Sequence, residues 1–178
     1  MIPFAKFFLR REDNCDEVCK LFDMPWPSVG APCPQLFIED GRLLLAYYVE
    51  TSSSDGSGFV TTKMVTPHTV DEQCVLVEFI RHSVSVFGPP NDEAFAGHPL
   101  AKKGLHPYGV FEIRNSSWIR KLERMNAVHP RHSAELYSML RHFVFTFHDS
   151  TFECIAHDFR FKKSIGSVRS VLMAAAAL

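Results

Sequence analysis

The residues most able to do chemistry include a short polar stretch, His148-Asp149-Ser150-Thr151, between two phenylalanine-rich runs. An imidazole oriented by a carboxylate can act as a general base or as a ligand. We therefore predict a catalytic role for His148 and a ligand-binding role for Asp149. The alternative is a turn between two strands, since Asp and Ser side chains readily hydrogen-bond to their own backbone. A Ser-His-Asp triad is excluded here, because adjacent residues in a tight turn cannot form the relay geometry.

A second candidate segment is the loop of residues 88–109, which contains four prolines and four glycines. Long loops within a domain are often functional, and binding residues are commonly carried on loops held by a rigid scaffold. We predict His98 as a second catalytic residue and Asn91 and Asp92 as ligand-binding residues. The alternative is a charged loop that is simply solvated.

Charged residues on two predicted strands form a third group. Glu112 and Arg114 share one face of the strand at 108–114, and Arg81 lies on the long strand predicted at 74–88. Glu112 is predicted as the catalytic partner of a histidine. The two arginines are predicted to bind a carboxylate or phosphate as bidentate donors. If this face is covered, the same charges must be paired, and such pairs are as often structural as functional.

The histidines suggest a metal only weakly. Seven of the nine fall between residues 98 and 157, but no His-Glu-x-x-His motif is present. His142 and His157, with Glu153 nearby, could supply two imidazoles and a carboxylate, but an ordinary solvated sheet face is the favoured interpretation. We therefore assign no metal ligands, and the sequence identifies no cofactor.

These residues must be positioned by a sheet. Asp40-Gly41 lies between two strand-like runs and favours a tight hairpin turn. A second hairpin is predicted from 141–147 and 152–159, with Phe147 opposite Phe152. Its core face would carry Phe143, Phe145, Phe147, Phe152, Cys154 and Ala156. Its reverse face would set His142 opposite His157 and Thr146 opposite Glu153.

Helices are expected in four places. The acidic residues before Val18, Leu21 and Phe22 suggest a short helix that ends at Pro25. Asn115 or Ser116 can cap a helix with an apolar stripe. A short helix is expected at 133–140, and the last segment, 161–173, suggests one weakened by a glycine.

Together these elements predict one α+β domain over residues 1–174, with a mainly antiparallel sheet of about six strands and a few short helices. Either a curved sheet or a half-open barrel fits this order. Residues 175–178 resemble a vector-derived tail and are excluded from the functional reasoning.

Composition limits the classes of partner. Residues 1–100 carry 7 Lys/Arg against 14 Asp/Glu, and residues 101–178 carry 12 against 6, but no basic run favours nucleic acid. No apolar stretch is long enough to predict a membrane span. The five cysteines form no disulfide framework, so we expect a reduced, soluble, cytoplasmic protein.

The leading hypothesis is a domain that binds a small polar or anionic ligand in an aromatic-lined pocket. The 88–109 loop and the 147–152 turn would form its mouth. One alternative is an enzyme of hydrolase or isomerase type, with or without a metal, that uses His148 or His98 as a general base. Another is a protein-interaction module. The sequence leaves a homo-oligomer open.

Overall fold

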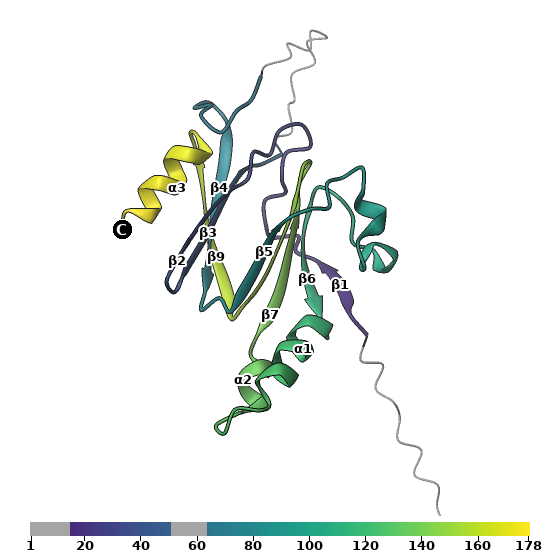
Figure 1. The fold of residues 1–178 in the computed structure, drawn as a ribbon. Coiled ribbons are helices and arrows are strands. Elements are labelled where there is room, and N and C mark those ends of the chain that lie inside the picture. The colour runs from purple at the N-terminus through teal and green to yellow at the C-terminus, as the bar shows by residue number, and fades with distance from the viewer. Residues whose placement is uncertain (1–14, 51–63) are drawn as a thin grey trace, which may run out of the picture.

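The computed structural model describes residues 15–50 and 64–178, which form two antiparallel sheets packed face to face (Figure 1). The five-stranded sheet has the order β1 (Glu17–Lys20), β6 (Gly109–Arg114), β7 (Arg141–Thr146), β8 (Thr151–Ala156), β5 (Val84–Gly88). The four-stranded sheet has the order β2 (Gln35–Glu39), β3 (Arg42–Tyr48), β4 (Gln73–Ile80), β9 (Asp158–Ile165). The α+β class and the antiparallel pairing are confirmed, with nine described strands in place of about six.

The core between the sheets contains a cluster of six buried aromatic side chains among aliphatic ones, and the alternation of phenylalanines predicts four of them. Tyr47 and Phe79 of the four-stranded sheet contact Phe145, with ring centroids 5.9 and 5.8 Å away. All six side chains predicted for the core face of the second hairpin are buried in this core. Since residues on one face of a strand alternate with those on the other, the polar residues between them must face outward.

The register of this hairpin differs from the prediction by two residues. Phe145, not Phe147, lies opposite Phe152, because β7 ends at Thr146 and the Phe147 N–H donates to the Ser150 carbonyl at 2.8 Å. A shift of two residues keeps every side chain on its predicted face. It changes the partners, however: Ile155 replaces His157 opposite His142, and Val144 lies opposite Glu153.

The strand predicted at 74–88 is two strands in different sheets. β4 ends at Ile80, Arg81 adopts a positive φ of 49°, and β5 then begins in the other sheet. β8 and β9 pass between the sheets in the same way at His157. The two crossings lie side by side, because the His157 N–H donates to the Ile80 carbonyl and the Ser83 N–H to the Ile155 carbonyl.

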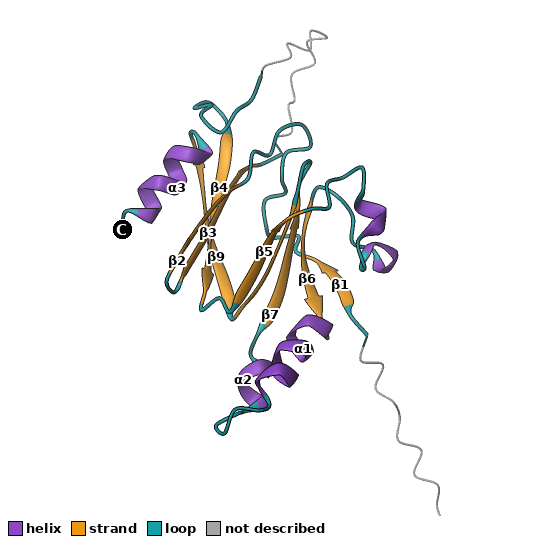
Figure 2. Cartoon of the chain, viewed as in Figure 1, coloured by secondary structure: helices purple, strands orange, loops and turns teal. Residues whose placement is uncertain are grey.

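Helix α3 (Val168–Ala176) covers the outer face of the four-stranded sheet (Figure 2). Val168 and Leu172 pack on Leu44, Ala46 and Tyr48. The Arg42 guanidinium donates to the carbonyls of Ala175 and Ala176 at 2.9 and 3.3 Å. The first two residues of the predicted tail thus lie within a packed helix.

The outer face of the five-stranded sheet is covered by the segment between β5 and β6. This segment contains two short 3₁₀ turns, η1 (Phe95–Gly97) and η2 (Ala101–Lys103). Phe95, Leu100 and Leu105 pack on Phe111 and Val144 of the sheet. This packing holds in place against the sheet the segment that contains the predicted loop residues Asn91, Asp92 and His98.

The remaining helices follow β6. Helix α1 (Ser117–Asn126) has Ser116 as its N-cap, as predicted, and is followed by the short helix α2 (Ala134–Ser138). The helix expected near Val18 is wrong: Glu17–Lys20 pairs with β6 as strand β1. Val18 packs against the cluster around Phe95, so tertiary contacts override the local helical pattern. None of the described helices has the length and hydropathy needed to cross a membrane.

Candidate functional site

The best-defined polar site is centred on Glu153, which projects from β8 on the outer face of the five-stranded sheet. His142 of neighbouring β7 donates from Nε2 to one carboxylate oxygen at 2.9 Å. His98 of the covering segment donates from Nε2 to the other at 3.2 Å. The two imidazoles are almost fully buried, with side chains 4% and 6% exposed, while Glu153 is 23% exposed. One carboxylate is thus held at both oxygens and still reaches solvent.

The hydrogen bonds indicate which nitrogen of each imidazole carries the ring proton. The Leu100 N–H donates to Nδ1 of His98 at 3.1 Å, so that nitrogen carries a lone pair and the ring proton is on Nε2. The Ser116 hydroxyl contacts Nδ1 of His142 at 2.9 Å. Ser116 also accepts the Ile119 N–H at 3.2 Å as the N-cap of α1, and its own proton can be donated to Nδ1 of His142 when the ring proton is on Nε2. With one proton on Nε2, each imidazole therefore has a hydrogen-bond partner at both ring nitrogens.

This arrangement keeps the carboxylate ionised. Burial alone would raise the pKa of Glu153, but the hydrogen bonds from His142 and His98, together with the positive charge of these rings when they are protonated, outweigh it and lower the pKa to about 2. A carboxylate oxygen has two acceptor positions. Each oxygen of Glu153 can therefore accept one further donor from a bound molecule.

Two adjoining hollows meet at Glu153. One has a volume of about 240 Å³; it is walled by Val86, Leu100 and Trp118 and reaches both imidazoles. The other, of about 420 Å³, lies on the proline-rich side of the covering segment and shares His98 and Glu153. Asp16 also lines the first hollow, which therefore combines apolar walls with two carboxylates.

The imidazoles do not fit a metal site. To bind a metal through Nε2, His98 would have to carry its proton on Nδ1, where the Leu100 N–H already donates. Among the residues that the structure describes, no three His, Cys, Asp or Glu side chains are grouped so that they could hold a metal ion.

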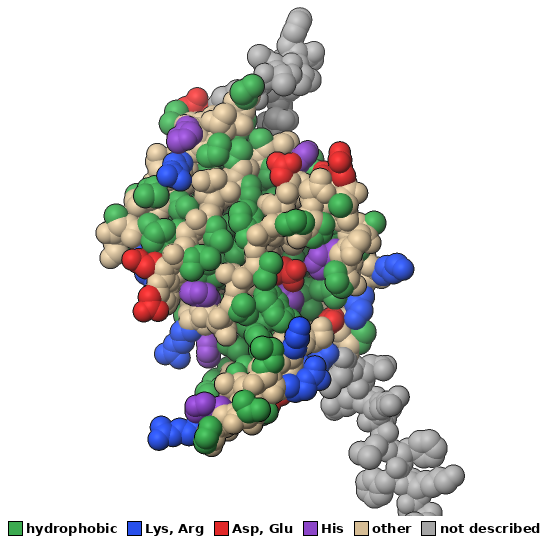
Figure 3. Space-filling view, in the orientation of Figure 1, with side chains coloured by type: hydrophobic (Ala, Val, Ile, Leu, Met, Phe, Trp, Pro, Cys, Tyr) green, Lys and Arg blue, Asp and Glu red, His purple; other side chains and the backbone are tan. Residues whose placement is uncertain are grey.

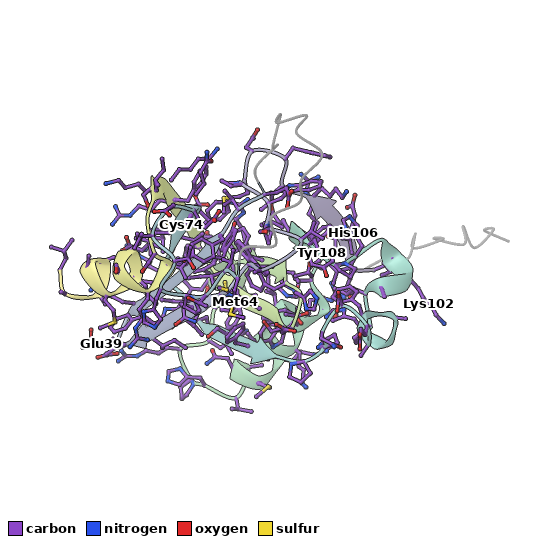
Figure 4. The ribbon with its side chains drawn as sticks, turned by 90° about the horizontal axis from the view of Figure 1, so that it is seen from above. Glu39, Met64, Cys74, Lys102, His106 and Tyr108 are labelled. Carbon is purple, nitrogen blue, oxygen red and sulfur yellow. The ribbon has the colours of Figure 1, made fainter. Side chains whose placement is uncertain are left out.

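The predicted meeting of the long loop and the second turn does occur, at a different place from the Glu153 site. The Asp92 N–H donates to the His148 carbonyl at 2.9 Å, and the imidazole lies 2.9 Å from Asp149 and 4.0 Å from Asp92. The Tyr108 hydroxyl also donates to Asp92. Seen from above, Tyr108 and His106 lie close together where the loop reaches β6, and Lys102 points away from the body (Figure 4). We call Asp92, Tyr108, His148 and Asp149 the exposed cluster.

The electrostatics of the exposed cluster follow from these contacts. Asp149 first, and then Asp92, raises the pKa of His148. The hydrogen bond from Tyr108 lowers the pKa of Asp92. Burial and Asp92 together raise the pKa of Tyr108 to about 12. The side chain of His148 is 44% exposed and that of Asp149 is 92% exposed, so this cluster faces water rather than a hollow.

The other predicted site residues are not brought together. Glu112 accepts two hydrogen bonds from Arg141, at 3.1 and 2.7 Å, near the start of β7, whereas His148 follows the other end of that strand. Arg81 lies in the crossing after β4, and Arg114 is exposed opposite Glu17 of β1. Asn91 accepts the Ala94 N–H within its own loop. Of the predicted residues, only His98 belongs to the Glu153 site.

Sequence reasoning named His142 and Glu153 only as part of a metal alternative, and considered Ser116 only as a helix cap. A usable signal was present, since His142 and Glu153 share the polar face of a hairpin whose other face is phenylalanine. The sequence could not show that His98, which is far away along the chain, lies beside Glu153 in the folded protein. Comparisons with protein-family models, with curated proteins and with solved structures find no match for this chain.

Proposed function

We propose that this protein binds a small molecule that carries an amine or ammonium group, with Glu153 as the anchor in the apolar hollow. The observation that carries the proposal is the ionised carboxylate held by His98 and His142 at 3.2 and 2.9 Å. A carboxylate already oriented by two hydrogen bonds loses little conformational freedom when it binds a cation. Its remaining acceptor positions open into the hollow.

The character of the hollow supports a cation over the anion considered from sequence. Both ring N–H groups are directed at Glu153, so neither remains to donate to an anionic ligand. Asp16 also lines the hollow, but its carboxylate already accepts from Ser117 and lies 3.7 Å from the Lys103 ammonium, so Glu153 is the carboxylate that anchors the ligand. Trp118 contributes an aromatic ring, to which an ammonium group is attracted by the ring quadrupole. The volume of about 240 Å³ favours a compact ligand.

The hydrogen bonds argue less well for an enzyme with a histidine general base. The lone pair of His98 accepts the Leu100 N–H, and Nδ1 of His142 is already engaged by the Ser116 hydroxyl. A carboxylate with a pKa of about 2 is a weak base. His148 is not at the hollow, and its raised pKa makes it more often protonated near neutral pH.

The test compares three probes of similar shape: benzylamine, benzyl alcohol and benzoate. We expect benzylamine to raise the melting temperature, because a ligand that binds only the native state stabilises it, and benzoate to have no effect. Glu153→Gln should abolish the response. Glu112→Gln, the same change at an ion-paired carboxylate outside the hollow, should retain it. An equal response of the wild-type protein to benzoate and benzylamine would contradict the proposal.

A further inference from the structure

The four edge strands of the two sheets differ in charge. β1 carries Glu17 and Lys20, and β2 carries Glu39. β9 carries Asp158, Arg160, Lys162 and Lys163. β5, with the sequence Val-Ser-Val-Phe-Gly, carries no charged residue. Charged residues on an edge strand discourage pairing with another chain, so β5 is the one described edge without this protection.

β5 also exposes apolar side chains. Val86 is 53% exposed on the outer face, and Phe87 is 41% exposed although it points inward and contacts Phe152 at 6.3 Å between ring centroids. Among the described residues, no strand pairs with the outer edge of β5. Figure 3 shows hydrophobic side chains along the middle of the face on which Figure 1 places this strand. On β5, an unpaired backbone edge and exposed apolar side chains therefore occur together.

We infer that β5 is a homodimer interface, in which it pairs antiparallel with β5 of a second copy about a two-fold axis beside Val86. Val86 is the middle residue of the strand, so a symmetric pairing sets it opposite Val86 of the partner subunit. The pairing joins the two five-stranded sheets into one continuous sheet. It ends where Pro89 lacks an N–H and where the chain crosses between sheets at 81–83.

A second copy is the occupant that these features favour. An uncharged strand opposite itself places no like charges in register, whereas self-pairing of β9 would juxtapose its lysines. A two-fold contact consumes both β5 edges and leaves only charged edges, so the assembly closes at two subunits rather than extending into a fibre. The contact would also bring Val86 of the partner subunit next to the Val86 that walls the hollow.

Sedimentation velocity on the full chain tests this interface. We expect a monomer–dimer equilibrium in the wild-type protein at concentrations up to about 1 mM, because an interface built on one five-residue strand from each subunit is small and weak. Val86→Lys sets two lysines opposite each other at the two-fold axis, although each also faces Glu153 of its own chain on β8, and should raise the dissociation constant at least about tenfold. The matched control is Ile38→Lys on the β2 edge, since Ile38 is 55% exposed and Val86 53%; it should leave the dimer intact.

A charge-swap experiment makes the test specific to the two-fold register. Val86→Glu alone should also dissociate, and an equimolar mixture of V86K and V86E should restore a heterodimer. The inference is overturned if the wild-type protein stays monomeric throughout this range, if Ile38→Lys dissociates the dimer as strongly as Val86→Lys, or if the mixture fails to associate. Circular dichroism of each variant checks that the exposed substitutions leave the fold intact.

Discussion

The Glu153 site and the exposed cluster use the same chemical groups in different surroundings. Each pairs imidazole with carboxylate, and each draws on the segment between β5 and β6: His98 in the first, and Asp92 and Tyr108 in the second. The histidine side chains of the Glu153 site are 4% and 6% exposed, whereas His148 is 44% exposed. Burial, rather than the residue types, therefore separates an organised site from an ordinary surface pair.

The largest expected difference between the two regions is in stability. Glu153→Ala leaves the Nε2–H groups of His98 and His142 buried without acceptors, and should lower the free energy of unfolding by about 3 kcal/mol. Asp149→Ala, in the exposed cluster, should be indistinguishable from wild type. Urea denaturation of both variants measures the difference. Equal losses would mean that the exposed pair is as important to the fold as the buried one.

The pH dependence of stability should be dominated by Glu153. Its pKa is about 2 in the folded protein and 4.5 without such contacts, so the unfolded chain takes up the proton first as the pH falls. The stabilisation is complete above pH 4.5 and is lost progressively towards pH 2. Its size is about 3 kcal/mol, because one pH unit of pKa difference corresponds to about 1.4 kcal/mol.

Urea titrations at several pH values between 5 and 2 follow this loss in the wild-type protein and in Glu153→Gln. The variant cannot ionise at this position, so its stability should fall less steeply over the same range. Parallel curves would show that Glu153 is not the carboxylate responsible.

A smaller effect tests the link between the Glu153 site and helix α1. Ser116→Ala removes the N-cap of α1 and the hydroxyl bonded to His142, and should destabilise the protein by about 1–2 kcal/mol. Ser133→Ala is a close control, because Ser133 precedes α2 without a side-chain capping bond. Thermal unfolding should separate the two variants. If both behave like wild type, Ser116 does not support His142.

Alternation along strands made much of the core predictable. The phenylalanines of the second hairpin face the core because side chains two residues apart share a face, and this holds even after the register shifts by two. The Ser116 cap was predictable for a similar local reason, since its hydroxyl bonds to a backbone N–H three residues away. Local periodicity carries this information without knowledge of the fold.

The Glu153 site depends on contacts that no local pattern encodes. His98 is 55 residues from Glu153, and it reaches the carboxylate because Phe95 and Leu100 on either side pack on the sheet. The same limitation explains β1, which is a strand because β6 offers a free edge. It also explains why Glu112 was misplaced relative to His148, since their separation depends on the direction of β7. The sequence correctly indicated that the 88–109 loop supplies a histidine to the site, but it paired His98 with Glu112 and His148 in place of Glu153 and His142.

The smallest expected effect is the titration of His148, followed by NMR from its ring proton signals. Asp149 and Asp92 raise its pKa above 6.5, with Asp149 as the larger cause. A raised pKa means that the charged contact is fully present below 6.5 and is lost as the pH rises through the folded value. Asp149→Asn should therefore bring the midpoint closer to 6.5 than Asp92→Asn does. A wild-type midpoint at or below 6.5 would show that water screens these contacts completely, and the exposed cluster would then be no more than the turn that its sequence also allows.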